Sequence, residues 1–452
     1  MDKLSGVAPH RSLRDLSLKY GPLMHLKLGS ISTIVISSAQ LAMVVMKTHD
    51  LTFASRPKVV SAKTLGYNYT DVALAPYGIY WRMLRKICTL ELLSLKRVHS
   101  YRFVREEEVS LFVQSIASSC GKPVNLGETL FTYNHDIITR IAFGKKSDDP
   151  LRFKAAMKEG VLLAGGFHIG DFFPSLEFVG SISGMKARLQ KNFSELDSIL
   201  SKVIEEHLQK DNDVENEDLV DVLLRIKENE ELEMPLTHDN IKAVILDLFV
   251  GGTENASNTT EWAMSEMIKN PRIMEKAQAE VRRVVGGKMK VEESDLSELT
   301  YMKMVIKETL RLHTPLALLL PRESMEACTL NGYEIPAKTR VLINYWAIAM
   351  DPLTWKDPEV FEPERFLGNS IDYKGNDFEF IPFGAGRRIC PGISFAIYNM
   401  ELGLASLLYH FDWKLPNDMK REDLDMDATF GLTLFKTNNL HLVPSLHFQG
   451  SS

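Results

Sequence analysis

The sequence predicts a mostly helical fold with smaller β-sheets, which places the chain in the α+β class. Two short β-rich runs, Leu23–Leu28 and 32–37, flank Gly29 and predict a hairpin within residues 22–40. Another β-rich portion covers residues 330–345, and a last one covers about 432–444. Elsewhere apolar residues recur at helical spacing. These helical segments lie near residues 40–48, 80–93, 102–118, 130–143, 183–208, 217–228 and 238–269.

Length and composition describe an ordinary folded protein and exclude several classes. The chain has 452 residues, 45% of them hydrophobic and 25% charged, with a net charge of −6. Because this composition has no concentrated basic face, we expect no nucleic-acid partner. Four widely spaced cysteines without a C-x-x-C pair argue against a zinc site or a disulfide framework. Length alone allows one to three domains.

A glycine-rich loop, residues 382–392, delivers one cysteine to the start of an apolar helix that begins near Ile393. A thiolate so placed is an electron-rich axial ligand for haem iron and favours cleavage of the O–O bond. Amides at the helix start and the charges of Arg387 and Arg388 would favour the thiolate form of Cys390. The alternative is a small buried structural cysteine.

This loop resembles the haem-binding loop of cytochromes P450, in which Phe, Gly, Arg, Cys and Gly recur at these offsets. The likeness covers nearly the whole chain and includes residues 54–57, 75–81 and 422–426, which are typical of plant members. It implies the cytochrome P450 fold, with a single catalytic domain over residues 1–452. In that fold haem b, iron protoporphyrin IX, lies between a long distal helix, here 238–269, and the proximal helix that follows the cysteine loop.

The resemblance also assigns individual residues to the cofactor. Cys390 is then the axial ligand of the iron, and Phe383 covers the sulfur with apolar surface. Trp81 and Arg85 match a W-x-x-x-R motif on a helix that contacts a haem propionate. Positive charge near two buried carboxylates would offset their cost of desolvation. The implied cofactor residues are Trp81, Arg85, Arg322, Phe383, Gly386, Arg388 and Cys390.

A second group of charges is implied to fix the cysteine loop. Glu308 and Arg311 lie three residues apart and therefore share one helical face. With Arg365 downstream, they resemble the Glu–Arg–Arg network of cytochromes P450. A lone E-x-x-R is a weak signal, because surface pairs like it are common; its order along the chain with the other motifs makes it strong.

The long helix contains an unusual pair of glycines. Thr237 can cap it, and Asn270-Pro271 ends it, so that roughly 32 residues would span about 48 Å. Gly251 and Gly252 each cost roughly 1 kcal/mol inside a helix, so something must approach that backbone closely. The resemblance implies a groove for dioxygen, with Gly252 among its catalytic positions. The alternative is close packing against another helix.

The same helix carries the main departure from the family pattern. The acidic position is Glu254, and Asn255 stands where the family usually has threonine. In the family that hydroxyl helps to deliver protons to the distal oxygen, and an amide has no comparable acid–base group. Two explanations stay open. Either Asn255, helped by Ser257, still organises the water chain, or the enzyme performs an oxidation that needs less conventional proton delivery.

The substrate walls are assigned by position in the family pattern. They are largely apolar, which suits a lipophilic substrate oriented by a few hydrogen bonds. Residues 165–174 are expected to form a mobile entrance, whereas 211–218 and 227–233 are expected to be exposed connectors. The implied wall residues are Val72, Leu74, Phe249, Gly251, Leu316, Ala317, Leu318, Phe430, Leu432 and Thr433.

The resemblance implies a haem-thiolate monooxygenase that oxidises a terpenoid, alkaloid or phenylpropanoid, usually by hydroxylation. It takes O2 and electrons from NADPH–cytochrome P450 reductase, with cytochrome b5 as an optional second donor, and acts as a monomer. Desaturation, cyclisation or C–C coupling are alternative outcomes. A hydroperoxide isomerase and a haem sensor are the alternatives from other classes.

The resemblance implies a location on the cytosolic face of the endoplasmic reticulum membrane. Plant microsomal members begin with an anchor helix and a proline-rich hinge, and this sequence has neither. It also lacks any run of 18 or more apolar residues and any signal-peptide core. We therefore expect an anchor-deleted form of a membrane-surface enzyme, with a natural soluble form as the alternative.

Overall fold

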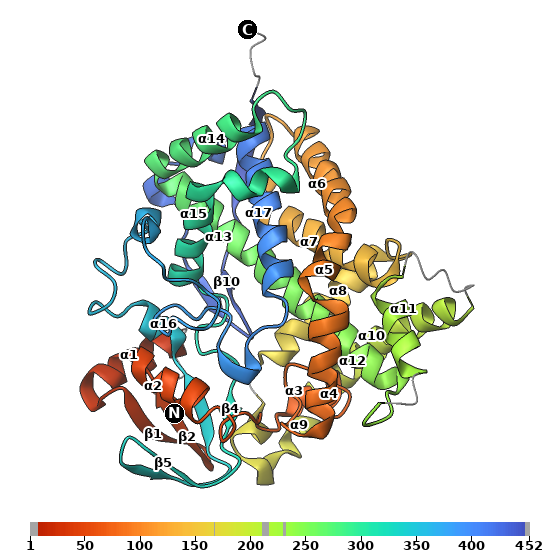
Figure 1. Ribbon diagram of the computed structural model, residues 1–452, viewed down its shortest axis with the longest axis vertical. Coiled ribbons are helices and arrows are strands. Elements are labelled where there is room, and N and C mark those ends of the chain that lie inside the picture. The colour runs from red at the N-terminus through yellow and green to blue at the C-terminus, as the bar shows by residue number, and fades with distance from the viewer. Residues whose placement is uncertain (1–7, 167, 210–216, 229–231, 448–452) are drawn as a thin grey trace.

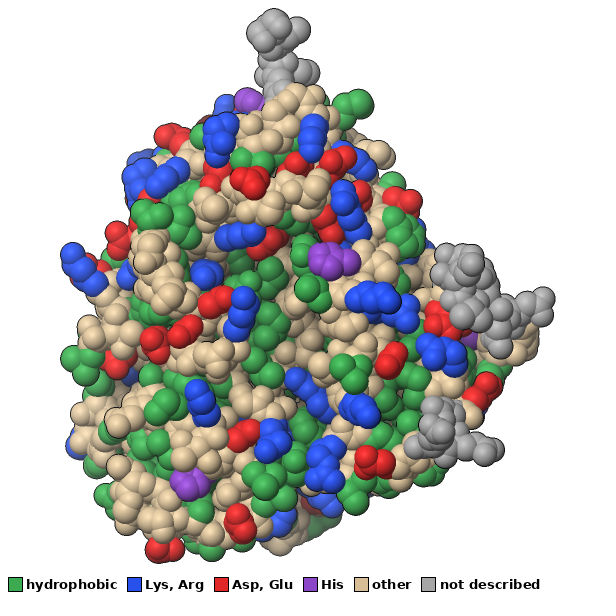
Figure 2. All heavy atoms as spheres, in the orientation of Figure 1, with side chains coloured by type: hydrophobic (Ala, Val, Ile, Leu, Met, Phe, Trp, Pro, Cys, Tyr) green, Lys and Arg blue, Asp and Glu red, His purple; other side chains and the backbone are tan. Residues whose placement is uncertain are grey.

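The computed structural model describes residues 8–447 except residue 167 and residues 210–216 and 229–231. Figure 1 shows a broad helical body with a small sheet region at one corner, beside the labelled N-terminal end. Figure 2 shows that basic and acidic side chains are interspersed over this face of the molecule. The α-helices are α1 (Pro9–Tyr20), α2 (Ala39–Met43), α3 (Val60–Leu65), α4 (Ile79–Ile87), α5 (Leu95–Ser100), α6 (Arg102–Ala117), α7 (Leu126–Phe143), α8 (Pro150–Ala164), α9 (Val179–Ile182), α10 (Met185–Leu208), α11 (Leu219–Lys227), α12 (His238–Phe249), α13 (Asn255–Lys269), α14 (Pro271–Val285), α15 (Thr300–Leu312), α16 (Tyr345–Ala349) and α17 (Ile393–His410).

The strands form small sheets, as predicted. The main sheet has the order β1-β2-β7-β4, in which β1 and β2 are the predicted hairpin around Gly29 and β2 pairs in parallel with β7. Glycine suits this turn because its φ is 65°. The strands are β1 (Leu23–Leu28), β2 (Ile31–Ile36), β3 (Val124–Asn125), β4 (Arg322–Glu323), β5 (Cys328–Leu330), β6 (Tyr333–Ile335), β7 (Arg340–Ile343), β8 (Phe411–Lys414), β9 (Ala428–Phe430), β10 (Leu434–Lys436) and β11 (His441–Leu446).

The long helix predicted over 238–269 is present, but it is not uniform. It consists of α12, a π-helical turn at Val250–Glu254, and α13. Thr237 caps it as predicted: the Asn240 amide donates to Thr237 Oγ1 at 3.2 Å, and the Thr237 amide donates to Asn240 Oδ1 at 2.9 Å. A π-helical turn widens the helix locally and often marks a functional site.

The distal helix runs through the middle of the hydrophobic core. Its second half, α13, contacts α7, α15 and α17, and α17 is the helix that follows the cysteine loop. One large cluster of buried apolar side chains joins these helices to α6 and α14. The core therefore fixes the distal helix against α17, and the predicted cofactor would lie between the π-helical turn and the residues that precede α17.

The connecting segments are packed against the rest of the fold at two places. Most of 211–218 and part of 227–233 lie outside the described residues, but Asp218 is only 4% exposed, so it is not a solvated connector residue. It caps α11, and its carboxylate lies 2.8 Å from His207 Nε2. In the 165–174 segment, the Phe172 carbonyl accepts from the Ser30 amide of the hairpin. Whether this segment moves as an entrance stays a prediction.

Candidate active site

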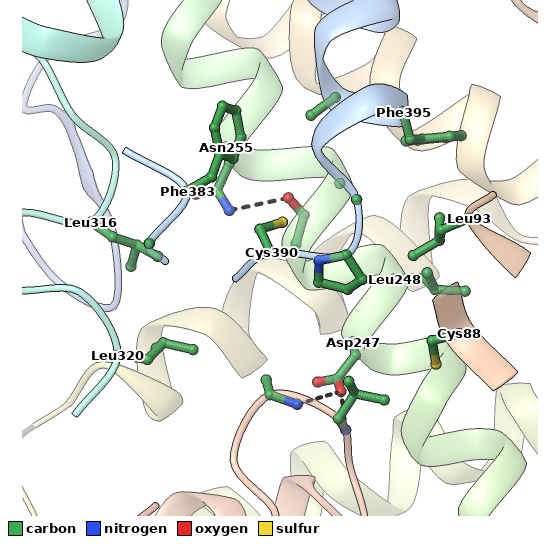
Figure 3. A pocket seen from close by; sticks show the side chains of 18 of the residues that line it. Cys88, Leu93, Asp247, Leu248, Asn255, Leu316, Leu320, Phe383, Cys390 and Phe395 are labelled. Carbon is green, nitrogen blue, oxygen red and sulfur yellow. Dashed lines mark hydrogen bonds between the residues drawn. The ribbon is translucent and has the colours of Figure 1, made fainter. Parts of the chain in front are cut away.

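A cavity lies between the cysteine loop and the π-helical turn of the distal helix (Figure 3). Cys390 and Phe383 line one side, and Gly251, Gly252 and Asn255 line the other. The cysteine loop and the distal helix, which are far apart in the sequence, therefore face each other as predicted. Much of the remaining wall is apolar, including Leu93, Ile138, Ile141, Val244, Leu248, Leu316, Leu319, Leu320 and Phe395.

The loop geometry presents the sulfur of Cys390 to this cavity. The Cys390 amide donates to the Phe383 carbonyl at 2.9 Å, which closes a tight turn before α17. Gly386 has a φ of +67°, and a Cβ there would stand 2.1 Å from the backbone oxygen of Met46. Only glycine therefore fits at this position, because both the left-handed backbone and the neighbouring chain exclude a side chain.

The charges around the sulfur differ from the sequence expectation. Burial raises the pKa of the Cys390 thiol, while the Gly392 amide and the nearby Arg85 guanidinium oppose that rise. Arg387 is exposed and pairs with Asp50 at 3.5 Å, so it is not a neighbour of the sulfur. The helix-start amide acts as expected, but the opposing cation comes from α4 and not from Arg387 or Arg388.

Buried arginines surround one end of the cavity. Arg322 Nη2 donates to the Ala385 carbonyl at 2.8 Å, and Arg388 donates to the carbonyls of Ala54 and Ala75 at 2.7 and 2.6 Å. The guanidinium of Arg388 also stacks on the Trp81 ring at 3.9 Å.

The two residues of the W-x-x-x-R motif both line the cavity, but they differ in their partners. Trp81 donates its indole N–H to the Val72 carbonyl at 2.9 Å. Arg85 makes no hydrogen bond within the part of the chain that the structure describes. Its guanidinium is thus available to a group in the cavity.

A further arginine, Arg56, is a cavity residue that the sequence motifs did not predict, although it lies in the 54–57 segment that is typical of plant members. It is 6% exposed, lines the cavity, and donates to the carbonyls of Ala73 and Leu320 at 3.0 and 2.7 Å. Burial and the charges of Arg388 and Arg322 lower its pKa. No motif marked it as a cofactor residue, because its role depends on loops that meet only in the fold.

This excess of buried cations tests whether the haem fits. Four arginines line the cavity, at positions 56, 85, 322 and 388, whereas its wall contains one carboxylate, Asp247; Asp50, outside the wall, pairs with Arg322 at 3.3 Å. Buried like charges are costly unless anions neutralise them. A ligand with two carboxylates and an iron would supply counter-charges for these arginines, above all for Arg85, and a metal partner for the Cys390 sulfur. The residues present therefore fit a haem.

The two glycines of the distal helix have different surroundings. A Cβ on Gly251 would meet nothing within 4 Å, whereas a Cβ on Gly252 would stand 2.8 Å from Ile138 Cδ1 of α7. Gly251 thus leaves the groove open toward the cavity, and Gly252 allows α7 to pack closely. Gly251 therefore fits the interpretation of an open groove, and Gly252 fits the interpretation of close packing against another helix.

Asn255 lies in the cavity wall, whereas its predicted helpers lie behind it. Its amide nitrogen donates to the Gly251 carbonyl at 3.1 Å, and its Oδ1 has no partner among the described residues. Ser257 donates to the Thr253 carbonyl at 2.6 Å and does not line the cavity. Glu254 accepts from Thr433 Oγ1 at 3.3 Å, and burial raises its pKa. Roles for Glu254 and Asn255 in proton delivery stay predictions.

The Glu308 carboxylate holds both predicted arginines. Its Oε1 accepts from Arg311 Nη2, Arg365 Nε and the Glu362 amide at 2.8, 2.8 and 2.9 Å, and its Oε2 accepts from Arg311 Nε at 2.8 Å. Glu308 and Arg311 are both 0% exposed. This is a fully satisfied buried network, and not a surface pair.

Only part of the predicted substrate wall lines the cavity. Val72, Gly251 and Leu316 do, but Leu74, Phe249, Ala317, Leu318, Phe430, Leu432 and Thr433 do not. Phe249 is 0% exposed and packs against Phe153 and Phe143 in the core. It is two residues from Gly251, about 200° around the helix, so it points away.

The other predicted wall residues that do not line this cavity have partners elsewhere, and their contact with a substrate stays a prediction. Ala317 packs with Trp346, Leu318 with the cluster beneath the main sheet, and Phe430 stacks on His10. Asp247 and Leu248, four and three residues before Gly251, share its helical face and line the cavity. Helical spacing could have found both.

Comparisons with known proteins agree with this site. The chain matches the family model described as Cytochrome P450 over residues 3–443. Desmethyl-deoxy-podophyllotoxin synthase of Sinopodophyllum hexandrum is 54% identical over 444 residues, 97% of this chain and 87% of the relative. Premnaspirodiene oxygenase of Hyoscyamus muticus is 49% identical over 97% of this chain and 88% of the relative.

Two further similarities extend this result. Germacrene A hydroxylase of Barnadesia spinosa is 48% identical over 99% of this chain and 90% of the relative. A solved structure of a zebra fish cytochrome P450 with progesterone has a TM-score of 0.85 at 27% identity, covering 97% of this chain and 100% of that one.

Proposed function

Since this chain belongs to the cytochrome P450 family and is a monooxygenase, we propose that it oxidises a lipophilic plant terpenoid, alkaloid or phenylpropanoid, usually by hydroxylation. The electrons come from NADPH through a cytochrome P450 reductase, with cytochrome b5 as an optional second donor. The observation that carries the proposal is the Cys390 sulfur facing the widened turn of the distal helix across a largely apolar cavity.

The names of the relatives support the substrate class. They refer to a podophyllotoxin, to premnaspirodiene and to germacrene A, and two of them state oxygenation or hydroxylation. The apolar wall suits such compounds, because a lipophilic molecule gains free energy when it leaves water.

The residues of this chain divide the work as follows. When bound, the haem supplies the activation of dioxygen and the oxidation of a C–H bond. Cys390 would hold the iron, and Arg56, Arg85, Arg322 and Arg388 would hold the two carboxylates. The apolar wall excludes water from the substrate, which strengthens polar interactions inside the cavity.

Asn255 would position water by its unpartnered Oδ1 and donate only through its amide, which is already bonded to Gly251. Because no hydroxyl stands at this position, cyclisation, desaturation or C–C coupling stay open as outcomes. The intact cysteine loop argues against a hydroperoxide isomerase, and a haem sensor would need no substrate cavity.

The proposal extends to partners and location. Arg82 and Lys86 are exposed on α4 and could receive an acidic reductase surface by charge steering.

Among the described residues, none of the helices combines the length and the apolar composition of a membrane span. We place the protein at the cytosolic face of the endoplasmic reticulum, acting as a monomer; cell fractionation and size-exclusion chromatography test these two points.

Reconstitution tests the chemistry directly. Haem-loaded protein, reduced under carbon monoxide, should give the Soret band of a thiolate-ligated haem, and Cys390→Ala should lose it. With purified reductase and NADPH, a panel of plant terpenoids, alkaloids and phenylpropanoids should yield oxygenated products that depend on all components. A nitrogen-ligated spectrum would overturn the cofactor assignment, and product formation without reductase or O2 would favour the isomerase.

A further inference from the structure

The loop at residues 71–75 is held by two buried carboxylates. Asp247 Oδ2, on the distal helix, accepts from the amides of Val72 and Ala73 at 2.6 and 3.0 Å (Figure 3). Asp71 Oδ1 accepts from the Leu74 amide at 3.0 Å. Three consecutive amides of this short stretch are therefore bound to carboxylate oxygens.

The carbonyls of the same loop bind the arginine end of the cavity. Ala73 accepts from Arg56, and Ala75 accepts from Arg388. The loop is thus fixed through both its donors and its acceptors. The amides of Val72 and Ala73 both donate to Oδ2 of Asp247, so loop anchoring uses only one of its two oxygens.

Asp247 differs from Asp71 because it lines the cavity. Asp71 is 5% exposed and does not belong to the cavity wall, whereas Asp247 retains exposed surface although protein surrounds it on all sides. That surface faces the cavity. Its Oδ1 has no hydrogen-bond partner among the described residues, in a wall that is otherwise mostly apolar.

The pKa of the Asp247 carboxyl is shifted in the direction that favours its neutral form, and a neutral carboxyl forms hydrogen bonds and not ion pairs. Burial and the nearby charge of Asp71 raise the pKa of Asp247. A neutral carboxyl can keep Oδ2 as acceptor for the two loop amides while Oδ1 carries the proton. An O–H in an apolar cavity lacks a partner until a ligand supplies an acceptor, and leaving it unpaired is costly.

We propose that Asp247 is a specificity-determining residue whose Oδ1 binds an oxygen atom of the substrate, so that preferred substrates already carry a carbonyl or hydroxyl group. This inference rests on the proposed function and narrows its substrate class. Asp247 precedes Gly251 by one helical turn and Asn255 by two, which is about 6 and 12 Å along the helix axis. The oxygen would therefore lie roughly 6–12 Å from the carbon to be oxidised. An earlier oxidation step must supply such a substrate.

Two ligands with one carbon skeleton test the proposal: the sesquiterpene hydrocarbon valencene and its ketone nootkatone. Dissociation constants are measured for the haem-loaded protein from the Soret spin-state shift, or by competition with an azole where a ligand gives no shift. The quantity of interest is the ratio of the hydrocarbon constant to the ketone constant. Comparing this ratio between variants cancels the difference in hydration of the two ligands.

Three variants separate ligand binding from loop anchoring. Asp247→Ala should lower the ratio by about 5- to 10-fold, the value of one neutral hydrogen bond. Asp247→Asn keeps an acceptor for the loop and a donor for the ketone, so its ratio should stay within about 3-fold of wild type. Asp71→Asn perturbs the same loop from outside the cavity and should change both constants alike, which leaves the ratio unchanged.

The outcomes distinguish this inference from the proposed function. An equal ratio in wild type and Asp247→Ala, including the case in which neither ligand binds, overturns the role of Asp247. A change of the ratio in Asp71→Asn as large as in Asp247→Ala also overturns it, because loop position alone would then set the preference. The thiolate spectrum is measured in the same samples; its absence would instead refute the proposed function.

Discussion

Removal of the Glu308 carboxylate should destabilise the protein far more than removal of an exposed glutamate. Glu308→Ala deletes four hydrogen bonds and leaves Arg311, which is 0% exposed, without its counter-ion. Breaking one partner of a buried ion pair costs about 3–5 kcal/mol. At about 2 cal/mol/K per residue, the unfolding entropy of 452 residues is about 0.9 kcal/mol/K. The Tm should therefore fall by about 3–5 °C.

Differential scanning calorimetry of the haem-loaded protein measures this shift at one scan rate. Glu206→Ala is the matched control, because Glu206 of α10 pairs with two exposed lysines, Lys145 at 3.0 Å and Lys202 at 3.7 Å, and exposed pairs are worth less than about 1 kcal/mol each. Glu308→Gln keeps the volume but places a donor against donors, so it should lose most of the same stability. A wild-type Tm for Glu308→Gln, or equal shifts for Glu308→Ala and the control, would refute the reasoning.

Other perturbations give sharper local tests. Gly386→Ala would place a Cβ 2.1 Å from the Met46 carbonyl and should abolish haem retention, measured as the ratio of Soret to protein absorbance. The control is Gly121→Ala, where a Cβ would meet nothing within 4 Å; it should cost only about 1–2 kcal/mol of stability for its left-handed backbone. Burial raises the pKa of Glu401 from 4.5 to about 7, so the folded chain holds a proton that the unfolded chain releases, and stability falls as pH rises through this window. Glu401→Gln should therefore raise stability by up to about 3 kcal/mol at pH 8 and by less than about 1 kcal/mol at pH 5; equal effects at both would contradict the assignment. Asn255→Thr should change the ratio of product to hydrogen peroxide per NADPH consumed, and an unchanged ratio would remove Asn255 from proton delivery.

The predictions from the sequence hold where the determining contacts are local. The hairpin around Gly29, the Thr237 cap and the i,i+3 pairing of Glu308 with Arg311 each depend on a few neighbouring residues. The family and the fold, inferred mainly from the cysteine loop, are confirmed by the family model and by the solved structure of the zebra fish protein.

The site could be predicted less completely, because its details depend on contacts between remote segments. The π-helical turn, which contains Gly251 and Gly252 of the cavity wall, is not visible in the apolar spacing. The backbone partners of Arg388, the carbonyls of Ala54 and Ala75, lie more than 300 positions away in the sequence and could not be predicted, whereas its role toward the cofactor stays a prediction. Asp218 lies in a charge-dense stretch and is nevertheless buried, since capping α11 takes it out of water.

The unequal surroundings of Gly251 and Gly252 have a consequence for how this protein can diversify. A methyl group at Gly251 would project into empty space and narrow the chamber without disturbing the helix–helix contact behind it. At Gly252 the same methyl would stand 2.8 Å from the end of the Ile138 side chain, so the packing against α7 would have to adjust. Evolution or engineering can thus resize the reaction chamber one carbon at a time at the first position, whereas a change at the second also requires a new side-chain arrangement on α7.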